Sequence, residues 1–236
     1  MITAYKIFRT QVERYKPLGL EKKPFRHFFR WRRSLVSGGS TISEELPWIT
    51  FEAIDYLDRH LKEGAKVFEY GGGGSTLYFL KKAKEVITVE HDKGWFEELK
   101  KLISAKNKNA WKGLFIIGEK GDLTERPDPA HPGHYSSADA ASAGFNYRNY
   151  ASAIDSYPNQ YFDLVVVDGR SRPACLKHAI SKVSKGAYLL LDNSDRPYYL
   201  EKMGDELSPL FEAVVDTYGP SPFSKDFTKT TIWKKK

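Results

Sequence analysis

Two acidic residues separated by a run of glycines carry the clearest chemical signal in this sequence. Glu69 closes a short apolar stretch, glycines fill positions 71–74, and Glu90 closes a β-branched stretch 21 residues after Glu69. Glycines let a bulky ligand lie against the backbone, and an acidic residue at this distance can bind both hydroxyls of a ribose. Ser75 and Thr76 begin a helix whose free N–H groups face the same ligand. The alternative is a flexible loop, but the spacing predicts a nucleoside-cofactor site.

Alternating apolar patterns predict the elements that must position these residues. Strands are expected at 65–69, 85–90, 113–117, 161–167, 187–191, 212–218 and 228–234. Helices are expected from Pro47 to Gly64, over 75–83 and 93–105, after Pro173, and over 197–207. A loop rich in Pro, Gly and Ser joins the last two strands, which favours an antiparallel pair. The predicted fold is therefore α/β, a Rossmann-like, seven-stranded, mostly parallel sheet with helices on both faces and a C-terminal antiparallel β-hairpin.

Further polar residues fall at the ends of these strands. Asp168 follows the fourth predicted strand, and Asp192 and Asn193 follow the fifth. Ligands of open α/β sheets sit outside the carboxyl ends of the strands. We therefore expect these three residues at the same edge of the sheet as Glu69 and Glu90.

Positive charge is concentrated near the N-terminus. Residues 1–33 hold ten Lys or Arg and two Glu, a net +8, so the other 203 residues sum to −1. We divide the chain into a basic, partly helical arm and linker over 1–46 and a main domain over 47–236, with a lid-like insertion at 118–150. A single cysteine, no signal-peptide pattern and no apolar run of ~18 residues predict a cytoplasmic protein without a membrane span.

The segment 25–33 of the arm alternates aromatic and basic residues. After a first predicted helix over 3–16, this segment is expected to be helical with Phe25, Phe28 and Phe29 on one face. Three roles are open for it. The aromatics can pack on the main domain, the helix can anchor the protein peripherally to anionic lipid, or the basic residues can clamp a nucleic-acid backbone.

Four segments, taken in order, resemble the motifs of class I S-adenosylmethionine-dependent methyltransferases. They are VFEYGGGGST, VITVEHD, DLVVVDGRSR and YLLLDNSDR, and the resemblance covers roughly residues 47–234. An acidic residue two positions before the first glycine is typical of that family. Dinucleotide-binding proteins instead have a third glycine where this chain has Thr76.

The resemblance implies S-adenosyl-L-methionine as the cofactor. Glu69 and Gly71 to Gly73 would contact its methionine moiety and Glu90 its ribose. His91 or Asp92 would border its adenine, and Gly121-Asp122 resembles a motif that often borders it too. The implied cofactor-binding residues are Glu69, Gly71, Gly72, Gly73, Ser75, Thr76, Glu90, His91, Asp122 and Asp168.

The residues after the fourth and fifth strands bear on the acceptor. Amine-methylating members of the family carry an Asn/Asp/Ser-Pro-Pro-aromatic motif where this chain has Asp168-Gly169-Arg170, which argues against that branch. Asp168, Asp192 and Asn193 resemble the Mg²⁺ ligands of catechol-type O-methyltransferases, although Ser171 replaces that group's lysine. Alternatively, Asp192 and Asn193 cap the following helix and Asp168 acts as a base.

Asp168, Arg170 and Asp192 are the predicted catalytic residues. Arg170 and Arg172 either clamp an anionic group of the substrate or pair with nearby aspartates. The predicted activity is O-methylation of a small-molecule or glycan hydroxyl. The alternatives are an RNA methyltransferase that uses the basic arm, and a non-enzymatic member that binds a membrane or a partner.

Overall fold

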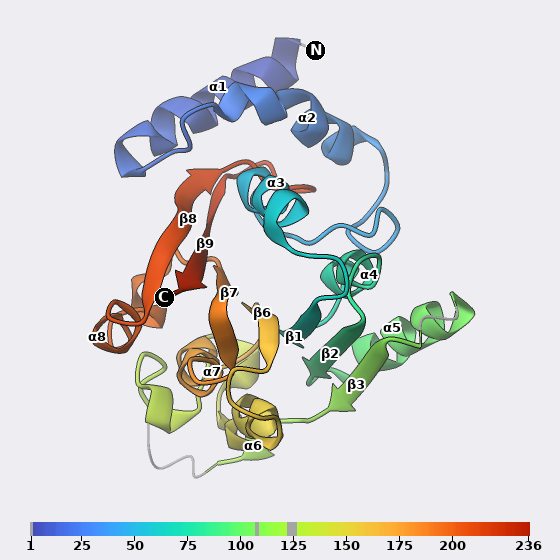
Figure 1. Cartoon of the computed structure of the whole chain (residues 1–236). Coiled ribbons are helices and arrows are strands. Elements are labelled where there is room, and N and C mark those ends of the chain that lie inside the picture. The colour runs from blue at the N-terminus through green and yellow to red at the C-terminus, as the bar shows by residue number, and fades with distance from the viewer. Residues whose placement is uncertain (1, 107–108, 122–126) are drawn as a thin grey trace.

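The computed structural model describes residues 2–106, 109–121 and 127–236. Seven strands form one twisted sheet in the order β3-β2-β1-β6-β7-β9-β8 (Figure 1). Their bounds are β1 Lys66–Tyr70, β2 Glu85–Glu90, β3 Trp111–Phe115, β6 Phe162–Val167, β7 Val183–Asp192, β8 Phe211–Gly219 and β9 Thr228–Lys235. The strands from β3 to β7 pair in parallel, and β9 pairs antiparallel with β7 and β8. The predicted sheet and its terminal hairpin are confirmed.

Helices cover both faces of this sheet. α3 (Phe51–His60), α4 (Gly74–Phe79) and α5 (Lys93–Ala105) bury apolar side chains against one face, and α6 (Arg148–Ala151), α7 (Arg172–Ala179) and α8 (Gly204–Leu207) against the other. β6 explains this sandwich, because its run Val165, Val166 and Val167 sends side chains alternately to the two cores. A continuous apolar strand is therefore satisfied by burial on both faces.

Three predicted helices differ from the observed ones. The helix predicted from Pro47 begins at Phe51, because Thr50 caps it by accepting a hydrogen bond from the Ala53 backbone N–H (3.3 Å). The helix predicted over 75–83 ends at Phe79. The one predicted over 197–207 is split into a 3₁₀ turn at Pro197–Tyr199 and α8.

The N-terminal arm folds back onto the main body. α1 (Ile2–Tyr15) and α2 (Phe28–Val36), joined through 3₁₀ turns, lie across α3 and the β8–β9 hairpin (Figure 1). Phe8 and Trp31 are fully buried, and Phe8 packs against Phe227 with ring centroids 5.1 Å apart. The predicted face of Phe25, Phe28 and Phe29 is wrong in part, since Phe29 points outward and Trp31 joins Phe28 inside. The domain boundary at 46/47 stays a prediction.

The insertion contains only small elements in its described part. β4 (Glu119–Lys120) pairs antiparallel with β5 (Phe145–Asn146), and two 3₁₀ turns lie between them at Pro132–His134 and Ala140–Ser142. Within the described ranges, we find no helix with the length and apolar character that crossing a bilayer requires.

Candidate functional site

The glycine turn after β1 brings two strand ends into close contact. Gly71 has φ +87°, a conformation that favours glycine, and a Cβ there would lie 3.1 Å from the Gly169 backbone after β6. A Cβ on Gly72 would lie 2.6 Å from the Thr88 side chain. A Cβ on Gly73, by contrast, would meet only the Trp95 ring at 3.7 Å. The turn is therefore packed tightly from behind and open in front.

Glu90, at the end of β2, is held by backbone groups around this turn. One carboxylate oxygen accepts from Gly72 N (3.1 Å), and the other from His91 N (2.7 Å) and Asp92 N (2.9 Å). These N–H bonds and neighbouring His91 lower the pKa of Glu90, although burial opposes them. Glu90 thus stays a fixed anion that can accept hydroxyl hydrogen bonds.

Glu69 lies beneath the turn and is fully buried. Its Oε2 accepts from the hydroxyls of Thr76 (2.5 Å) and Thr88 (3.1 Å), and Thr76 Oγ1 also accepts from Gly73 N (3.0 Å). Burial raises the pKa of Glu69 to about 7. Its Oε1 has no partner among the described residues. Such an orphaned buried oxygen fits a site that receives a polar ligand group.

A cavity of about 320 Å³ opens in front of the glycine turn. Its lining includes most of the predicted cofactor residues: Gly71, Gly72, Gly73, Ser75, Glu90, His91 and Asp168. Thr41, Trp48 and Trp95 also line it, and sequence reasoning missed all three as site residues. Both tryptophans fall within predicted helices, from Pro47 to Gly64 and over 93–105, where an apolar side chain is expected to pack on the sheet. Instead Trp48 is 55% exposed before α3 begins, and Trp95 donates to Gly72 O (2.7 Å).

A second cavity of about 450 Å³ adjoins the first. Trp48, Asp168 and Arg172 line both. The rest of its wall comes from the end of β7 and from the β8–β9 loop: Asp192, Asn193, Asp195, Arg196, Ser221, Ser224, Asp226, Phe227 and Thr228. Four carboxylates face two guanidinium groups, so the wall has a formal charge of −2 when all are ionised.

Arg172 ties the ends of β6 and β7 together. Its guanidinium donates to Asp168 Oδ1 (2.8 Å), to the Asp192 carbonyl and to Asn193 Oδ1 (3.3 Å). It also bonds the carbonyls of Asp168 and Gly169, at 3.1 Å each. Burial raises the pKa of Asp168, and the Arg172 charge opposes the rise.

These contacts do not fit the predicted Mg²⁺ site. The Arg172 guanidinium already occupies the space between Asp168 and Asn193 and supplies the positive charge that a metal would bring. Asp192 Oδ1 instead accepts from Thr230 on β9 (2.8 Å), and Asn193 Nδ2 donates to Thr228 (3.1 Å). Within the described ranges, no three His, Cys, Asp or Glu side chains gather as metal ligands.

The alternative of a helix cap is also wrong for Asp192 and Asn193. Their side chains bond to β9, and the short helices that follow have no side-chain cap. Asp192 is almost fully buried, and burial together with the nearby Asp168 charge raises its pKa to about 8.

Arg170 links the glycine-turn site to the insertion. Its Nε donates to His91 Nε2 (2.9 Å), and its terminal nitrogen donates to Asp139 Oδ2 (2.6 Å). Arg170 and Arg172 therefore both bond to nearby protein groups, including the aspartates Asp139 and Asp168. These contacts agree with the alternative of pairing with nearby aspartates rather than with that of a clamp on the substrate. Asp122 lies outside the described residues.

Comparisons with known proteins give structural matches only. No protein-family model and no curated protein sequence matches the chain. An O-methyltransferase from Bacillus cereus, solved in complex with SAH, superposes with a TM-score of 0.58 at 16% identity and covers 88% of this chain and 96% of its own. An rRNA methylase from Streptococcus thermophilus superposes with a TM-score of 0.52 at 9% identity and covers 78% and 94%.

These matches agree with the strand order and the terminal hairpin. Five parallel strands, extended at one edge by an antiparallel pair, form the sheet, and the glycine turn lies at its carboxyl end. The chain therefore has the Rossmann-like fold of class I S-adenosylmethionine-dependent methyltransferases.

Proposed function

We propose that this protein is an S-adenosylmethionine-dependent methyltransferase that methylates a hydroxyl oxygen of a small molecule or glycan. One observation carries the proposal: Asp168 lies on the wall that the glycine-turn cavity shares with a second, adjoining cavity. Methyl transfer needs a donor and an acceptor side by side, with a polar group at their junction. The two cavities and Asp168 supply that arrangement.

The first cavity suits the cofactor. The open face of Gly73 and the neighbouring glycines would receive the amino-acid end, and the Glu90 carboxylate the ribose hydroxyls. His91 and Trp95 would border the base from the β2 side. When bound, S-adenosyl-L-methionine supplies an electrophilic sulfonium methyl group. Glu69 keeps a supporting role beneath the turn, because it fixes Thr76 and Thr88.

Asp168 is the group that we assign to the acceptor. Its Oδ1 is held by Arg172, which fixes the carboxylate at the junction of the cavities. Burial raises its pKa, so it is a stronger base than an exposed aspartate. Asp168 would accept the proton that the acceptor hydroxyl loses when its oxygen takes up the methyl group. No metal ion is needed for this step.

Arg170 and Asp192 take positioning roles in this proposal. Arg170 holds His91 at the first cavity and ties the insertion to the end of β6 through Asp139. Asp192, bonded to Thr230, fixes the floor of the second cavity.

The second cavity favours a neutral acceptor over a nucleic acid. Even with Asp192 protonated, three carboxylates face two guanidinium groups, so the wall would repel a phosphate backbone, whereas sugar hydroxyls carry no charge and can bond to carboxylates. RNA methylation through the arm therefore has no supporting contact at the described acceptor wall.

Isothermal titration calorimetry with S-adenosylhomocysteine tests the proposal. We expect saturable binding with one site per chain. Trp95→Phe provides a test variant: it removes the hydrogen bond to Gly72 O and reduces the ring that lines the cavity, and it should weaken binding by about fivefold or more. Absence of binding at high micromolar ligand would refute the cofactor and with it the proposed activity.

A further inference from the structure

The arm has an outer face that the main body leaves uncovered. Phe8, Phe28 and Trp31 point inward, but six large apolar residues of α1, α2 and the segment between them are exposed. They are Ile2 (75% exposed), Tyr5 (45%), Leu18 (55%), Phe25 (44%), Phe29 (71%) and Val36 (68%). We call the five other than Leu18 the outer apolar face.

Most of this face is continuous. The Tyr5 and Phe25 rings lie 6.1 Å apart, and both Tyr5 (5.9 Å) and Phe29 (5.4 Å) contact the edge of Phe28. Ile2 stands one helical turn before Tyr5. Val36 stands two turns after Phe29, on the same side of α2. Large aromatic and aliphatic side chains exposed together are uncommon on a soluble surface and mark an interaction site.

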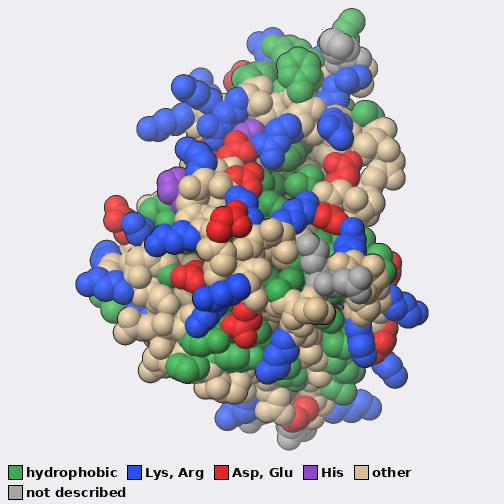
Figure 2. All heavy atoms as spheres, turned by 45° about the vertical axis from the view of Figure 1, so that its right-hand side comes forward, with side chains coloured by type: hydrophobic (Ala, Val, Ile, Leu, Met, Phe, Trp, Pro, Cys, Tyr) green, Lys and Arg blue, Asp and Glu red, His purple; other side chains and the backbone are tan. Residues whose placement is uncertain are grey.

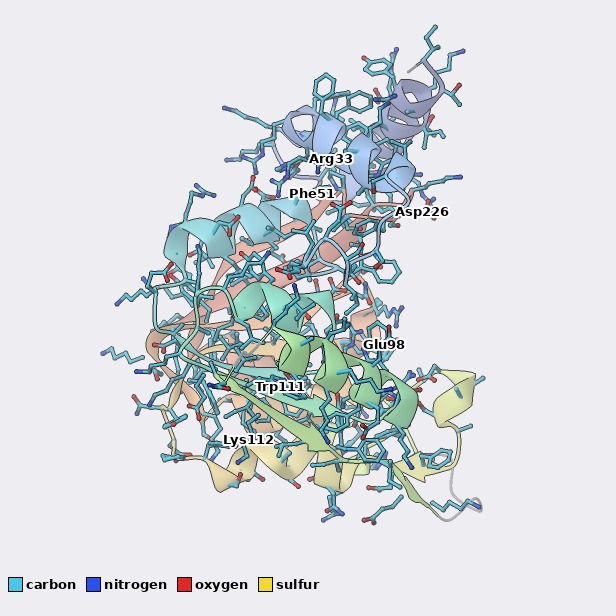
Figure 3. All side chains as sticks on the ribbon, turned by 90° about the vertical axis from the view of Figure 1, so that its right-hand side faces the viewer. Arg33, Phe51, Glu98, Trp111, Lys112 and Asp226 are labelled. Carbon is cyan, nitrogen blue, oxygen red and sulfur yellow. The ribbon has the colours of Figure 1, made fainter. Side chains whose placement is uncertain are left out.

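Basic side chains surround the outer apolar face. Arg26 pairs with Glu21 and Glu52, and Arg30 pairs with Asp55. The other Lys and Arg of the arm have no ion pair in the described part of the chain: Lys6, Arg9, Arg14, Lys16, Lys22, Lys23, Arg32 and Arg33. Figure 2 shows hydrophobic side chains among Lys and Arg side chains at this end of the molecule, and Figure 3 shows Arg33 on α2.

We propose that the outer apolar face is a docking surface for an anionic lipid bilayer. Aromatic and aliphatic side chains enter the boundary between headgroups and acyl chains, while the surrounding cations bind lipid phosphates and carboxylates. The charge complementarity is local, since the other 203 residues carry a net charge of only −1.

The apolar residues favour a bilayer over a nucleic acid. A phosphate-backbone clamp needs cations and polar groups, and stacking on bases needs aromatics. Neither role uses Ile2 or Val36, which are aliphatic and among the most exposed residues of the face. This inference goes beyond methyl transfer and does not depend on it.

Vesicle co-sedimentation of the full chain tests the proposal. We expect binding to vesicles of phosphatidylcholine with phosphatidylglycerol, weaker binding to phosphatidylcholine alone, and release by high salt. Arg32→Gln/Arg33→Gln should weaken binding to the anionic vesicles by about 30-fold, because each basic residue near the surface contributes about a factor of five. Phe29→Ser/Val36→Ser should weaken it by about tenfold or more.

Two control variants test whether any loss of binding is specific to the outer apolar face or follows from removing charge or apolar surface anywhere on the protein. Lys100→Gln/Lys101→Gln on α5 removes two exposed cations elsewhere, and Ile117→Ser/Leu210→Ser removes two exposed apolar side chains elsewhere. Both controls should bind as the unmodified chain does, and all variants should keep its melting temperature. The proposal is overturned by no binding to anionic vesicles, by equal losses in the controls, or by a chain that forms dimers through this face and ignores the vesicles. It also fails if the arginine pair governs binding to a single-stranded RNA oligonucleotide but not to vesicles.

Discussion

The two adjoining cavities are built in opposite ways. The first takes most of its lining from residues 71–95, a single segment that holds the glycine turn, α4, β2 and the start of α5, so residues close in sequence line the same cavity. The second takes its lining from Trp48, from the ends of β6 and β7, and from the β8–β9 loop, which lie far apart in the chain. A single segment can preserve the shape that the proposed cofactor needs in the first cavity. The wall of the second cavity, the proposed acceptor site, can change whenever one of its separate segments changes.

The two helices of the arm contact the wall of the second cavity, whereas Thr41 in its linker lines the first. Trp31 Nε1 donates to Ser224 O (2.7 Å), Phe223 N donates to Ser34 Oγ (3.0 Å), and Gln11 Nε2 donates to Asp226 Oδ1 (3.1 Å). Figure 3 shows Asp226 in the loop beside the arm. The wall of the second cavity is thus held from outside by α1 and α2, while the glycine turn packs against the strands of the sheet and against the linker at Thr41 and Leu46.

The largest effect that separates the two cavities is expected from Asp168→Asn. Loss of the proposed base should lower methyl transfer by about 10²–10⁴-fold. The rate is to be measured on whichever hydroxyl compound a screen with labelled S-adenosylmethionine identifies. Affinity for S-adenosylhomocysteine should change only a few fold. Asp195→Asn, an exposed carboxylate on the same wall, is the control and should keep most of the rate. Equal losses in both variants would remove Asp168 from its role.

Gly71→Ala should break the first cavity. The added Cβ would lie 3.1 Å from the Gly169 backbone at φ +87°, so the turn must shift away from the cofactor position. We expect calorimetry to show about a 100-fold loss of affinity for S-adenosylhomocysteine, about 2.7 kcal/mol.

Gly186→Ala is the control for this change. It sits at φ +76° with nothing within 4 Å of the added Cβ, so it carries the backbone strain without the clash. It should lose about 1 kcal/mol of stability and keep its affinity for the ligand. If the two alanine variants bind equally, the close approach of Gly71 and Gly169 does not shape the cavity.

Sequence reasoning succeeded where the structure is local. The alternation of apolar stretches and turns predicted the seven strands and the terminal hairpin, and the glycine run with Glu90 predicted the site of the first cavity, because each depends on residues close in sequence. It failed for Trp48, which is exposed because the helix begins at Phe51 instead of Pro47. It failed also for the Mg²⁺ site, since nothing local indicates that Arg172 reaches across from β6 to β7. Contacts between distant segments carry no periodic signal.

The pH dependence of stability tests the burial of Asp192 at the second cavity. Burial raises its pKa to about 8, whereas an unfolded aspartate titrates near ~4. The protonated folded form is therefore favoured at low pH, and its stabilising effect is lost as the pH rises through about 8. Relative to Asp192→Asn, the unmodified chain should lose up to ~1.4 kcal/mol of unfolding free energy per pH unit between those pKa values. Urea unfolding at several pH values measures the difference, and parallel curves would contradict it.

The smallest effect concerns the arm's hold on the acceptor wall. Gln11→Leu removes the hydrogen bonds to Asp226 Oδ1 (3.1 Å) and from Phe227 N (3.4 Å). Amide hydrogen exchange in residues 224–227 should rise by about fivefold, or about 1 kcal/mol, while affinity for S-adenosylhomocysteine stays unchanged. Thr10→Val is the matched control, because the Thr10 hydroxyl bonds only to the Lys6 carbonyl within α1. Unchanged exchange in the Gln11 variant would mean that the loop keeps its shape without the arm. If exchange rises and ligand affinity also falls, the two cavities are coupled. That result would contradict the inference that α1 and α2 support the second cavity independently of the first.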